Sequence, residues 1–311
     1  MSIDDAKPSG AMDYAIGGCS REISVVGSIV RTALRDLQLP QEVYKVRLSE
    51  PPDLAKMVRS LHRRKLAAIS LSGPLCHEAL RLADDADEGA TRSGCADMLM
   101  VTPSGVLASN TMYGTFVEWL ESAVSNRSTA VVVGSGARAC AVVAACQTLG
   151  FQVIGVTSRS WTSTEVLHES ESAERIRGLG ALPTLWPAHA GSVASTAFSR
   201  EMRLQFRELA ASANVLIQTV AIDPSTEDAL LLARTVPWSQ TPRDAVVCDL
   251  VYGPAPGPYL VEAERQGLAR VGGVEMLTRR GTRLIETWTG RRPPRASLHA
   301  AAVRVCMRSY G

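Results

Sequence analysis

The chain has 311 residues, of which 46% are hydrophobic and 21% are charged, a composition typical of globular proteins. Its 33 basic and 31 acidic residues leave a net charge of +2, which argues against nucleic acid or an anionic membrane as a partner. No apolar stretch reaches about 18 residues, so no transmembrane helix is expected. The N-terminal segment MSIDDAKPSG has no apolar core and carries two acidic residues, so no secretory signal is expected.

The seven cysteines are scattered along the chain, and no two of them form a C-x-x-C pair. Such an odd, dispersed set predicts free thiols and a cytoplasmic location. The five histidines lack H-E-x-x-H spacing, so we expect no metal site.

In the first third of the chain, apolar runs alternate with helical patterns. An apolar run at 13–16 is followed by strand patterns at 43–48, 67–72, 97–102 and 105–109. Helices are expected at 29–39, 54–61, 78–83 and 116–125. The last two strands read as a hairpin around Pro103 and Ser104.

The rest of the chain repeats the alternation with longer elements. Strands are expected at 129–133, 151–157, 182–185, 215–219 and 246–251. Helices are expected at 137–149, 165–179, 200–210 and 296–307. Strands that alternate with helices predict an α/β fold with a parallel, doubly wound sheet.

The segment VVVGSGARACAVV places Gly134, Gly136 and Ala139 in the pattern G-x-G-x-x-A, between a strand and a helix. The first glycine permits a tight turn, the second lets a pyrophosphate approach the backbone, and the alanine allows close packing. In this context the pattern indicates a dinucleotide site at the helix N-terminus, although a glycine turn without a ligand would look the same.

The end of the next strand distinguishes between the two nicotinamide cofactors. NAD sites usually carry an acidic residue here for the ribose hydroxyls, whereas this chain has Thr157, Ser158, Arg159 and Ser160. A guanidinium group can hold a 2′-phosphate through charge-assisted hydrogen bonds, so NADP is favoured. The alternative for Arg159 is an ordinary solvated arginine.

Several motifs together resemble the shikimate dehydrogenase (quinate/shikimate dehydrogenase) family, over about residues 14–290. GSGARACAVVAA is similar to that family's G-A-G-G-A-A-R-A loop, CDLVYGPAPGPYL to its D-L-V-Y-N-P-x-x-T-P-x-L run, and ETWTG to E-x-W-T-G. The resemblance implies an N-terminal α/β substrate domain completed by the C-terminal helices, residues 1–118 plus 276–311. A Rossmann-type NADP-binding domain, residues 119–275, would lie between these segments in the chain.

The resemblance also implies which residues bind the cofactor and the substrate. The implied cofactor residues are Gly134, Ser135, Gly136, Ala137, Ser158, Arg159, Ser160, Thr219, Val251, Tyr252 and Gly273. The implied substrate residues are Ser24, Ser72, Asn110, Met112 and Arg280.

The substrate motifs depart from the family pattern at the positions that carry the chemistry. Cys76 stands at the catalytic lysine and Met112 at the catalytic aspartate, while Asp97 replaces an asparagine and Arg280 a glutamine. Oxidising an alcohol by hydride transfer needs a group that accepts the hydroxyl proton, and a thioether cannot do this. The remaining candidates are Asp97, Cys76 and Tyr113. For Asp97 the alternative is an internal pair with Arg280 or Arg92, and for Cys76 a buried apolar role.

Three interpretations therefore stay open. The first is an NADP-dependent oxidoreductase that acts on a different small polar substrate, such as a zwitterionic or cyclic one. The second is a catalytically silent NADP-binding sensor or regulatory protein. The third is a genuine shikimate dehydrogenase of the aromatic amino acid pathway. In each case we expect a small-molecule ligand and a monomer or homodimer.

Overall fold

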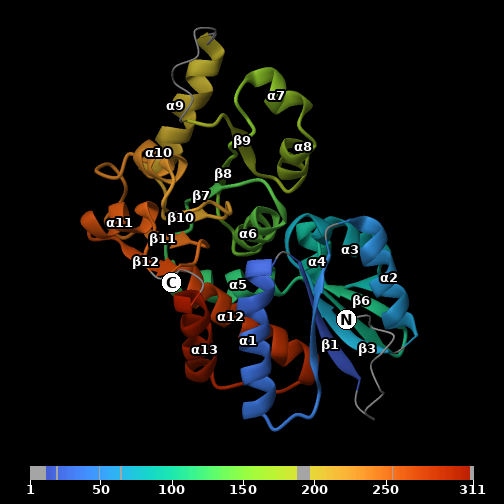
Figure 1. Cartoon of the computed structure of the whole chain (residues 1–311). Helices are drawn as coiled ribbons and strands as arrows, with labels where there is room; N and C mark the ends of the chain where they lie inside the picture. The colour runs from blue at the N-terminus through green and yellow to red at the C-terminus, as the bar shows by residue number, and fades with distance from the viewer. Residues whose placement is uncertain are drawn as a thin grey trace. The chain divides into compact units, whose positions relative to one another are not determined.

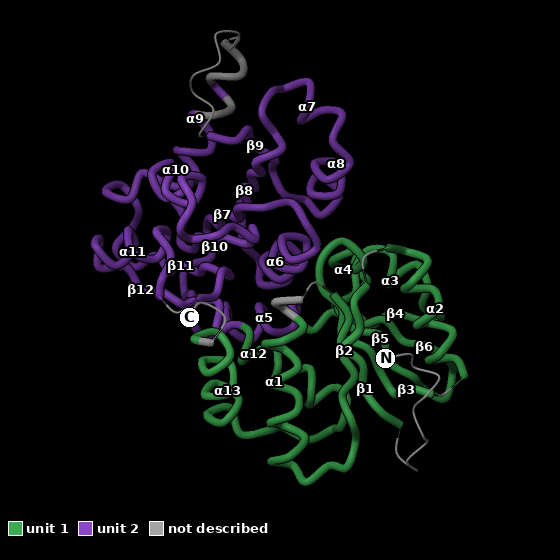
Figure 2. The backbone as a smooth tube through the Cα atoms, viewed as in Figure 1, with its two compact units in different colours: residues 1–111, 277–309, 311 green, residues 112–276, 310 purple. Residues whose placement is uncertain are grey.

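The computed structural model describes residues 12–18, 20–48, 50–63, 65–187, 197–253 and 255–308. The chain divides into two compact units (Figure 2). Unit 1 contains the residues up to Thr111 and those from Leu277 onward, and unit 2 contains Met112 to Met276. The chain passes from one unit to the other within helix α5 (Thr111–Ala123) and again within α12 (Gly273–Thr289).

Unit 1 is built on a mixed sheet (Figure 1). Its described strands are β1 (Asp13–Gly18), β2 (Val43–Arg47), β3 (Leu66–Ser70), β4 (Asp85–Ala86), β5 (Met98–Thr102) and β6 (Gly105–Ser109), in the order β2-β1-β3-β5-β6-β4. The β3–β5 and β5–β6 pairs are antiparallel, and the other pairs are parallel. The predicted hairpin of β5 and β6 is confirmed, with Pro103 and Ser104 in its turn.

Helices from both ends of the chain cover this sheet. They are α1 (Ser20–Asp36), α2 (Pro51–His62), α3 (Cys76–Leu82), α4 (Glu88–Ser93), α13 (Arg295–Arg308) and a short 3-10 turn, η2 (Gly73–Leu75). Helix α13 packs along α1, and a side chain at Gly281 of α12 would overlap Ile29 of α1. Trp288 of α12 stacks on Tyr14 of β1 with ring centroids 4.2 Å apart. The C-terminal helices therefore complete the N-terminal unit, as predicted.

Unit 2 is built on an all-parallel sheet. Its described strands are β7 (Thr129–Val133), β8 (Val153–Thr157), β9 (Leu182–Thr184), β10 (Val215–Gln218), β11 (Val246–Asp249) and β12 (Ala269–Gly272), in the order β12-β11-β10-β7-β8-β9. Its helices, besides α5, are α6 (Ala137–Thr148), α7 (Thr164–Glu169), α8 (Glu171–Gly178), α9 (Ala197–Ala211), α10 (Glu227–Thr235) and α11 (Pro258–Arg265). Read from β9, the strand order is that of a dinucleotide-binding sheet. The chain adds strands β8 and β9 on one side of β7 and then crosses to add β10, β11 and β12 on the other side, so the order of addition reverses between β7 and β10. The predicted doubly wound fold is confirmed.

Some predicted elements were wrong in their bounds or were missed. Helix α1 begins at Ser20 rather than at 29, since Ile23, Val26 and Val30 already form a buried stripe along its first turns. The single helix expected at 165–179 is two helices, because the backbone at Ser170 is extended and its hydroxyl caps α8. Helices α4, α10, α11 and α12 and strands β4 and β12 were not among the expected elements.

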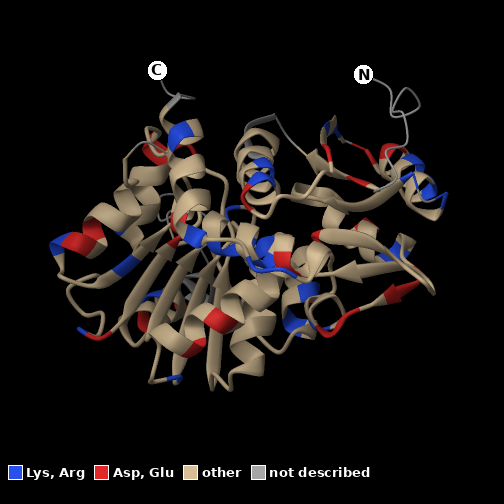
Figure 3. Ribbon diagram, turned by 90° about the horizontal axis from the view of Figure 1, so that it is seen from below, with Lys and Arg blue, Asp and Glu red and all other residues tan. Residues whose placement is uncertain are grey.

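Lysine and arginine residues and aspartate and glutamate residues are both distributed over the helices and loops of the ribbon (Figure 3). Among the described helices, none combines the length and the apolar character that crossing a bilayer would require.

Candidate functional site

The glycine loop of unit 2 lies at the end of β7, whose five residues are all buried. Gly134 has a φ of +119°, which favours glycine, and its N–H donates to the Thr157 carbonyl at 2.7 Å. A side chain at Gly134 would overlap the Thr219 hydroxyl, whereas a Cβ at Gly136 would meet no atom within 4 Å. The turn therefore needs its first glycine, and the space over the second is open to a ligand.

A chain of hydroxyl groups joins the glycine loop to the loop that follows β8. Ser135 donates to Ser158 at 2.9 Å, and the Ser158 and Ser160 hydroxyls are 3.1 Å apart. Beside them, Arg159 is exposed and its Nη1 atom lies 3.4 Å from Asp228 Oδ2 on α10. This ion pair is weak, since both partners are solvated, and an anion could displace Asp228.

The remaining predicted cofactor residues lie at the carboxyl ends of β10 and β11 and at the start of α12. Thr219 donates both its N–H and its hydroxyl to the Val133 carbonyl, each at 2.8 Å, which ties β10 to β7 beside the glycine loop. Gly273 opens α12 against the backbone that follows β11, since a Cβ there would lie 2.5 Å from the Val251 carbonyl oxygen. Tyr252 follows Val251 and is half-buried.

These features fit a dinucleotide phosphate at the start of α6. Gly136 is the N-cap of this helix and carries no side chain that could cap it, and open space lies above it. A helix N-terminus attracts anions through its N–H groups and its dipole. Gly136, Ala137, the serine hydroxyls and Arg159 are therefore the groups of unit 2 that would hold NADP.

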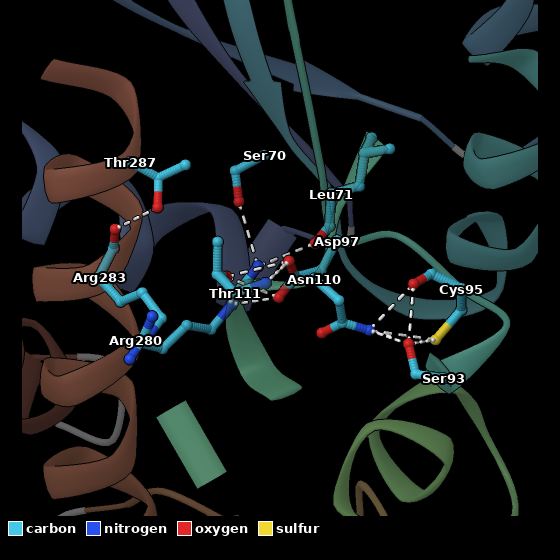
Figure 4. A network of polar contacts seen from close by, with 10 residues as sticks. All are labelled: Ser70, Leu71, Ser93, Cys95, Asp97, Asn110, Thr111, Arg280, Arg283 and Thr287. Carbon is cyan, nitrogen blue, oxygen red and sulfur yellow. Dashed lines mark hydrogen bonds and ion pairs between the residues drawn. The ribbon is translucent and has the colours of Figure 1, made fainter. Parts of the chain in front are cut away.

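In unit 1, Asp97 and Arg280 form a buried ion pair (Figure 4). Arg280 Nε donates to Asp97 Oδ2 at 2.9 Å, and its Nη2 donates to Ser70 Oγ at 3.2 Å and to the Leu71 carbonyl at 3.1 Å. Asp97 Oδ1 also accepts from the Thr111 N–H at 2.6 Å, which caps the first turn of α5. The sequence suggested two internal partners for Asp97, Arg280 and Arg92. The structure pairs Asp97 with Arg280, while Arg92 donates to Glu88.

The roles of Ser70 and Thr111 in this network were missed at the sequence level. The Thr111 hydroxyl donates to both Asp97 oxygens, at 3.0 and 2.8 Å, and is also 3.3 Å from Arg280 Nε. Thr111 stands at the start of a helix, where capping residues are common, and this position is the sequence signal for its role.

Asn110 belongs to a neighbouring set of contacts, also drawn in Figure 4. Its amide nitrogen donates to Ser93 Oγ at 2.8 Å and to the Cys95 carbonyl at 3.0 Å. The side chain is buried, so these bonds fix the loop between α4 and β5 against the end of β6. Asn110 thus has a structural task whether or not it binds a substrate.

The other predicted residues of unit 1 lie on three different elements. Ser24 is half-buried in helix α1. Ser72 is half-buried just after β3, where its hydroxyl packs so closely on Gly18 that a Cβ there would overlap it. Cys76 is buried as the first residue of α3, and its carbonyl accepts from the Ala96 N–H at 2.8 Å.

Met112 and Tyr113 belong to unit 2, in the first turn of α5, and both are buried. The Tyr113 hydroxyl lies 3.0 Å from the Thr148 hydroxyl, at the C-terminal end of α6. The glycine loop precedes the other end of this helix, roughly 16 Å away at 1.5 Å per residue. The structure therefore does not bring the Tyr113 phenol to the glycine loop.

No protein-family model matches the chain. It is 27% identical over 265 residues to the shikimate dehydrogenase (NADP(+)) of Rhizobium rhizogenes, which covers 84% of this chain and 83% of the relative. Among solved structures, Thermus thermophilus shikimate 5-dehydrogenase in complex with NADP(H) and shikimate matches with a TM-score of 0.71 and 22% identity, over 95% of this chain and 100% of that one. The 5-ketofructose reductase of a Gluconobacter strain matches with a TM-score of 0.74 and 18% identity, over 95% and 99%.

The two structural matches share the fold of this chain at identities too low to say more. The sequence match, however, extends across both units, at an identity that holds over most of the length of both proteins. The chain is therefore similar in sequence to shikimate dehydrogenases over most of its length.

Proposed function

We propose that the chain is an NADP-dependent oxidoreductase that acts on a small polar substrate other than shikimate. The observation that carries the cofactor part is the pairing of an open glycine loop with Arg159, which follows β8 where an NAD site would have an acid. Bound NADP would supply the hydride acceptor or donor. Unit 2 would hold the cofactor and unit 1 the substrate.

Cofactor titrations test this proposal directly. NADPH should bind at least about ten-fold more tightly than NADH, because a charge-assisted contact contributes roughly 1.5–3 kcal/mol. Arg159→Ala should remove most of the preference. Arg175→Ala is the matched control, because Arg175 is equally exposed at 42% and also lies 3.4 Å from an acid, Glu171. Equal affinity of the parent protein for both cofactors would refute the assignment.

The substrate part follows from the residues at the family's catalytic positions. Met112 has no titratable group, and Cys76 is a buried thiol. A positioned general base typically contributes a factor of about 10²–10⁴, so shikimate and quinate should be oxidised very slowly or not at all. Turnover of shikimate near about 10 per second would contradict this expectation. A panel of cyclic enones, imines and hydroxy acids would then reveal the substrate class.

A second candidate is a catalytically silent NADP-binding protein. The buried Asp97–Arg280 pair supports it, since both of the new charges are bound to each other within unit 1. Tight NADPH binding without turnover across the whole substrate panel would favour this candidate, whereas turnover of any panel member would exclude it.

A further inference from the structure

Helix α1 carries a glycine near its middle, Gly27, at a place where glycine is an unfavourable choice for a helix. The close approach of other side chains accounts for it. A Cβ at Gly27 would lie 2.9 Å from Cε of Lys45 in strand β2. It would also lie 3.5 and 3.8 Å from Nη1 and Nη2 of Arg31, which is one turn further along α1. Two cationic side chains of unit 1 therefore converge over Gly27.

The local fold places these cations on one accessible surface. Strand β2 is an edge strand of the unit 1 sheet, and helix α1 packs against it. Because side chains alternate along a strand, Arg47 shares the face of Lys45, two residues further on. Arg31, Lys45 and Arg47 are all exposed. A dissolved anion can therefore reach all three.

The acidic residues around β2 do not neutralise this pair. Asp13 and Glu42 both accept from the Tyr44 hydroxyl, at 3.3 Å each. Tyr44 directly precedes Lys45, so its side chain points to the opposite face of the sheet. Among the residues that the structure describes, neither Arg31 nor Lys45 has an acidic partner. The surface over Gly27 thus holds two positive charges without a counter-charge.

The electrostatics of Lys45 agree with this arrangement. Partial burial lowers the pKa of Lys45, and the nearby charge of Arg31 lowers it further. An anion between the two head groups would favour the charged lysine and offset the repulsion. The guanidinium offers paired N–H donors that match an oxyanion, and the ammonium group adds three more donors.

We propose that Arg31 and Lys45 together bind a phosphate group on the surface of unit 1, over Gly27. A phosphate carries close to two negative charges at neutral pH and has several acceptor oxygens, so it can meet the donors of both side chains. Because both cations are exposed, binding should be modest in affinity and sensitive to salt. This site lies in unit 1 and is separate from the cofactor site proposed in unit 2.

The amine of Lys45 can be observed directly, because the chain has only four lysines, Lys7, Lys45, Lys56 and Lys65. Reductive methylation with isotope-labelled formaldehyde keeps their charge and gives each an NMR signal, and Lys45→Arg identifies the signal of Lys45. Inorganic phosphate added to the full chain should shift this signal saturably and raise the pKa of Lys45 toward its ordinary value. Lys56, which lies 3.5 Å from Asp53, is the internal control. A Lys45 signal that responds to phosphate no more than to NaCl at equal ionic strength would overturn the proposal.

Variants test whether the two cations act together. Arg31→Gln should weaken phosphate binding at Lys45 by about five-fold, the upper range for an exposed charge contact. Gly27→Ala should weaken it as well, because the added methyl group displaces the end of the Lys45 side chain. Its melting temperature should not fall, since alanine favours the helix, so the loss cannot be assigned to unfolding. Arg35→Gln is the matched control on α1 and should have no effect, because Arg35 is already paired with Asp36. Unchanged binding in both Arg31→Gln and Gly27→Ala would refute the site.

Methyl phosphate distinguishes the free ion from a phosphate ester as the ligand. If it shifts the Lys45 signal with an affinity at least equal to that of inorganic phosphate, the site accepts a phosphate ester. If only inorganic phosphate does so, the ligand is the free ion. If neither compound binds, the proposal fails, and the NADP assignment is unaffected because it concerns residues of unit 2.

Discussion

The buried pair of Asp97 and Arg280 provides a quantitative test of how unit 1 is built. The aligned family motifs have asparagine and glutamine at these two positions, so Asp97→Asn and Arg280→Gln each restore one family residue. The double variant restores both. Because the two side chains are only 10% and 4% exposed, water cannot replace a lost partner.

Each single change should be costly. Arg280→Gln leaves the Asp97 carboxylate buried without a cation and removes the donors to Ser70 and Leu71. Asp97→Asn keeps an oxygen for the Thr111 N–H but leaves a buried guanidinium without its counter-charge. Breaking a buried pair from one side costs about 3–5 kcal/mol, whereas replacing both charges with neutral groups is often nearly neutral. We therefore expect about 3 kcal/mol or more of favourable coupling in the double variant.

Urea unfolding followed by circular dichroism measures the free energies of the four proteins. Hydrogen exchange at the Thr111 amide gives a local measurement within unit 1, because this N–H donates to Asp97. The amide should exchange faster in Arg280→Gln and recover its protection in the double variant. Single variants that each cost less than about 1 kcal/mol, or costs that simply add in the double variant, would show that the pair does not stabilise unit 1.

Three further changes test unit 2. Asp228→Asn removes the acid beside Arg159 and should strengthen NADPH binding by up to about five-fold in a fluorescence titration, with no change for NADH. Gly134→Ala should cost roughly 2–4 kcal/mol in urea unfolding, since it combines a positive φ with an overlap on Thr219. The pKa of Asp249 rises from 3.8 to about 7 on folding, so stability should fall by about 4 kcal/mol as the pH rises from 4 to 7; Asp249→Asn should abolish this part of the pH profile.

Local pattern was sufficient to predict most of the fold. In the run Thr129–Val133 every residue after the threonine is apolar, as expected for a strand covered on both faces, and the run is buried in the centre of the unit 2 sheet. Elements with weaker patterns were missed. Helix α10 exposes Leu230 and Leu231, which blurs its apolar stripe, and β12 has two exposed residues out of four.

Side-chain partners could not be predicted in the same way, because they depend on contacts between distant parts of the chain. Asp97 and Arg280 are 183 residues apart, and the sequence offered Arg92 as an equally reasonable partner. Tyr113 stays a candidate proton donor. Its hydroxyl lies 3.0 Å from the Thr148 hydroxyl, a neighbour that no sequence pattern indicated.

Asp97 and Arg280, the two new charges in unit 1, neutralise each other in a buried pair, and this limits what can bind beside them. A cationic ligand at Asp97 would have to displace Arg280, which also donates to Ser70 and Leu71. An anionic ligand at Arg280 would have to displace Asp97, which also caps α5 through Thr111. Either exchange would forfeit several buried hydrogen bonds, each contributing about 1 kcal/mol and more where a charge is involved. A neutral substrate, recognised by hydroxyl and amide groups, avoids this cost, so neutral carbonyl and hydroxyl compounds are the first members of the panel to test.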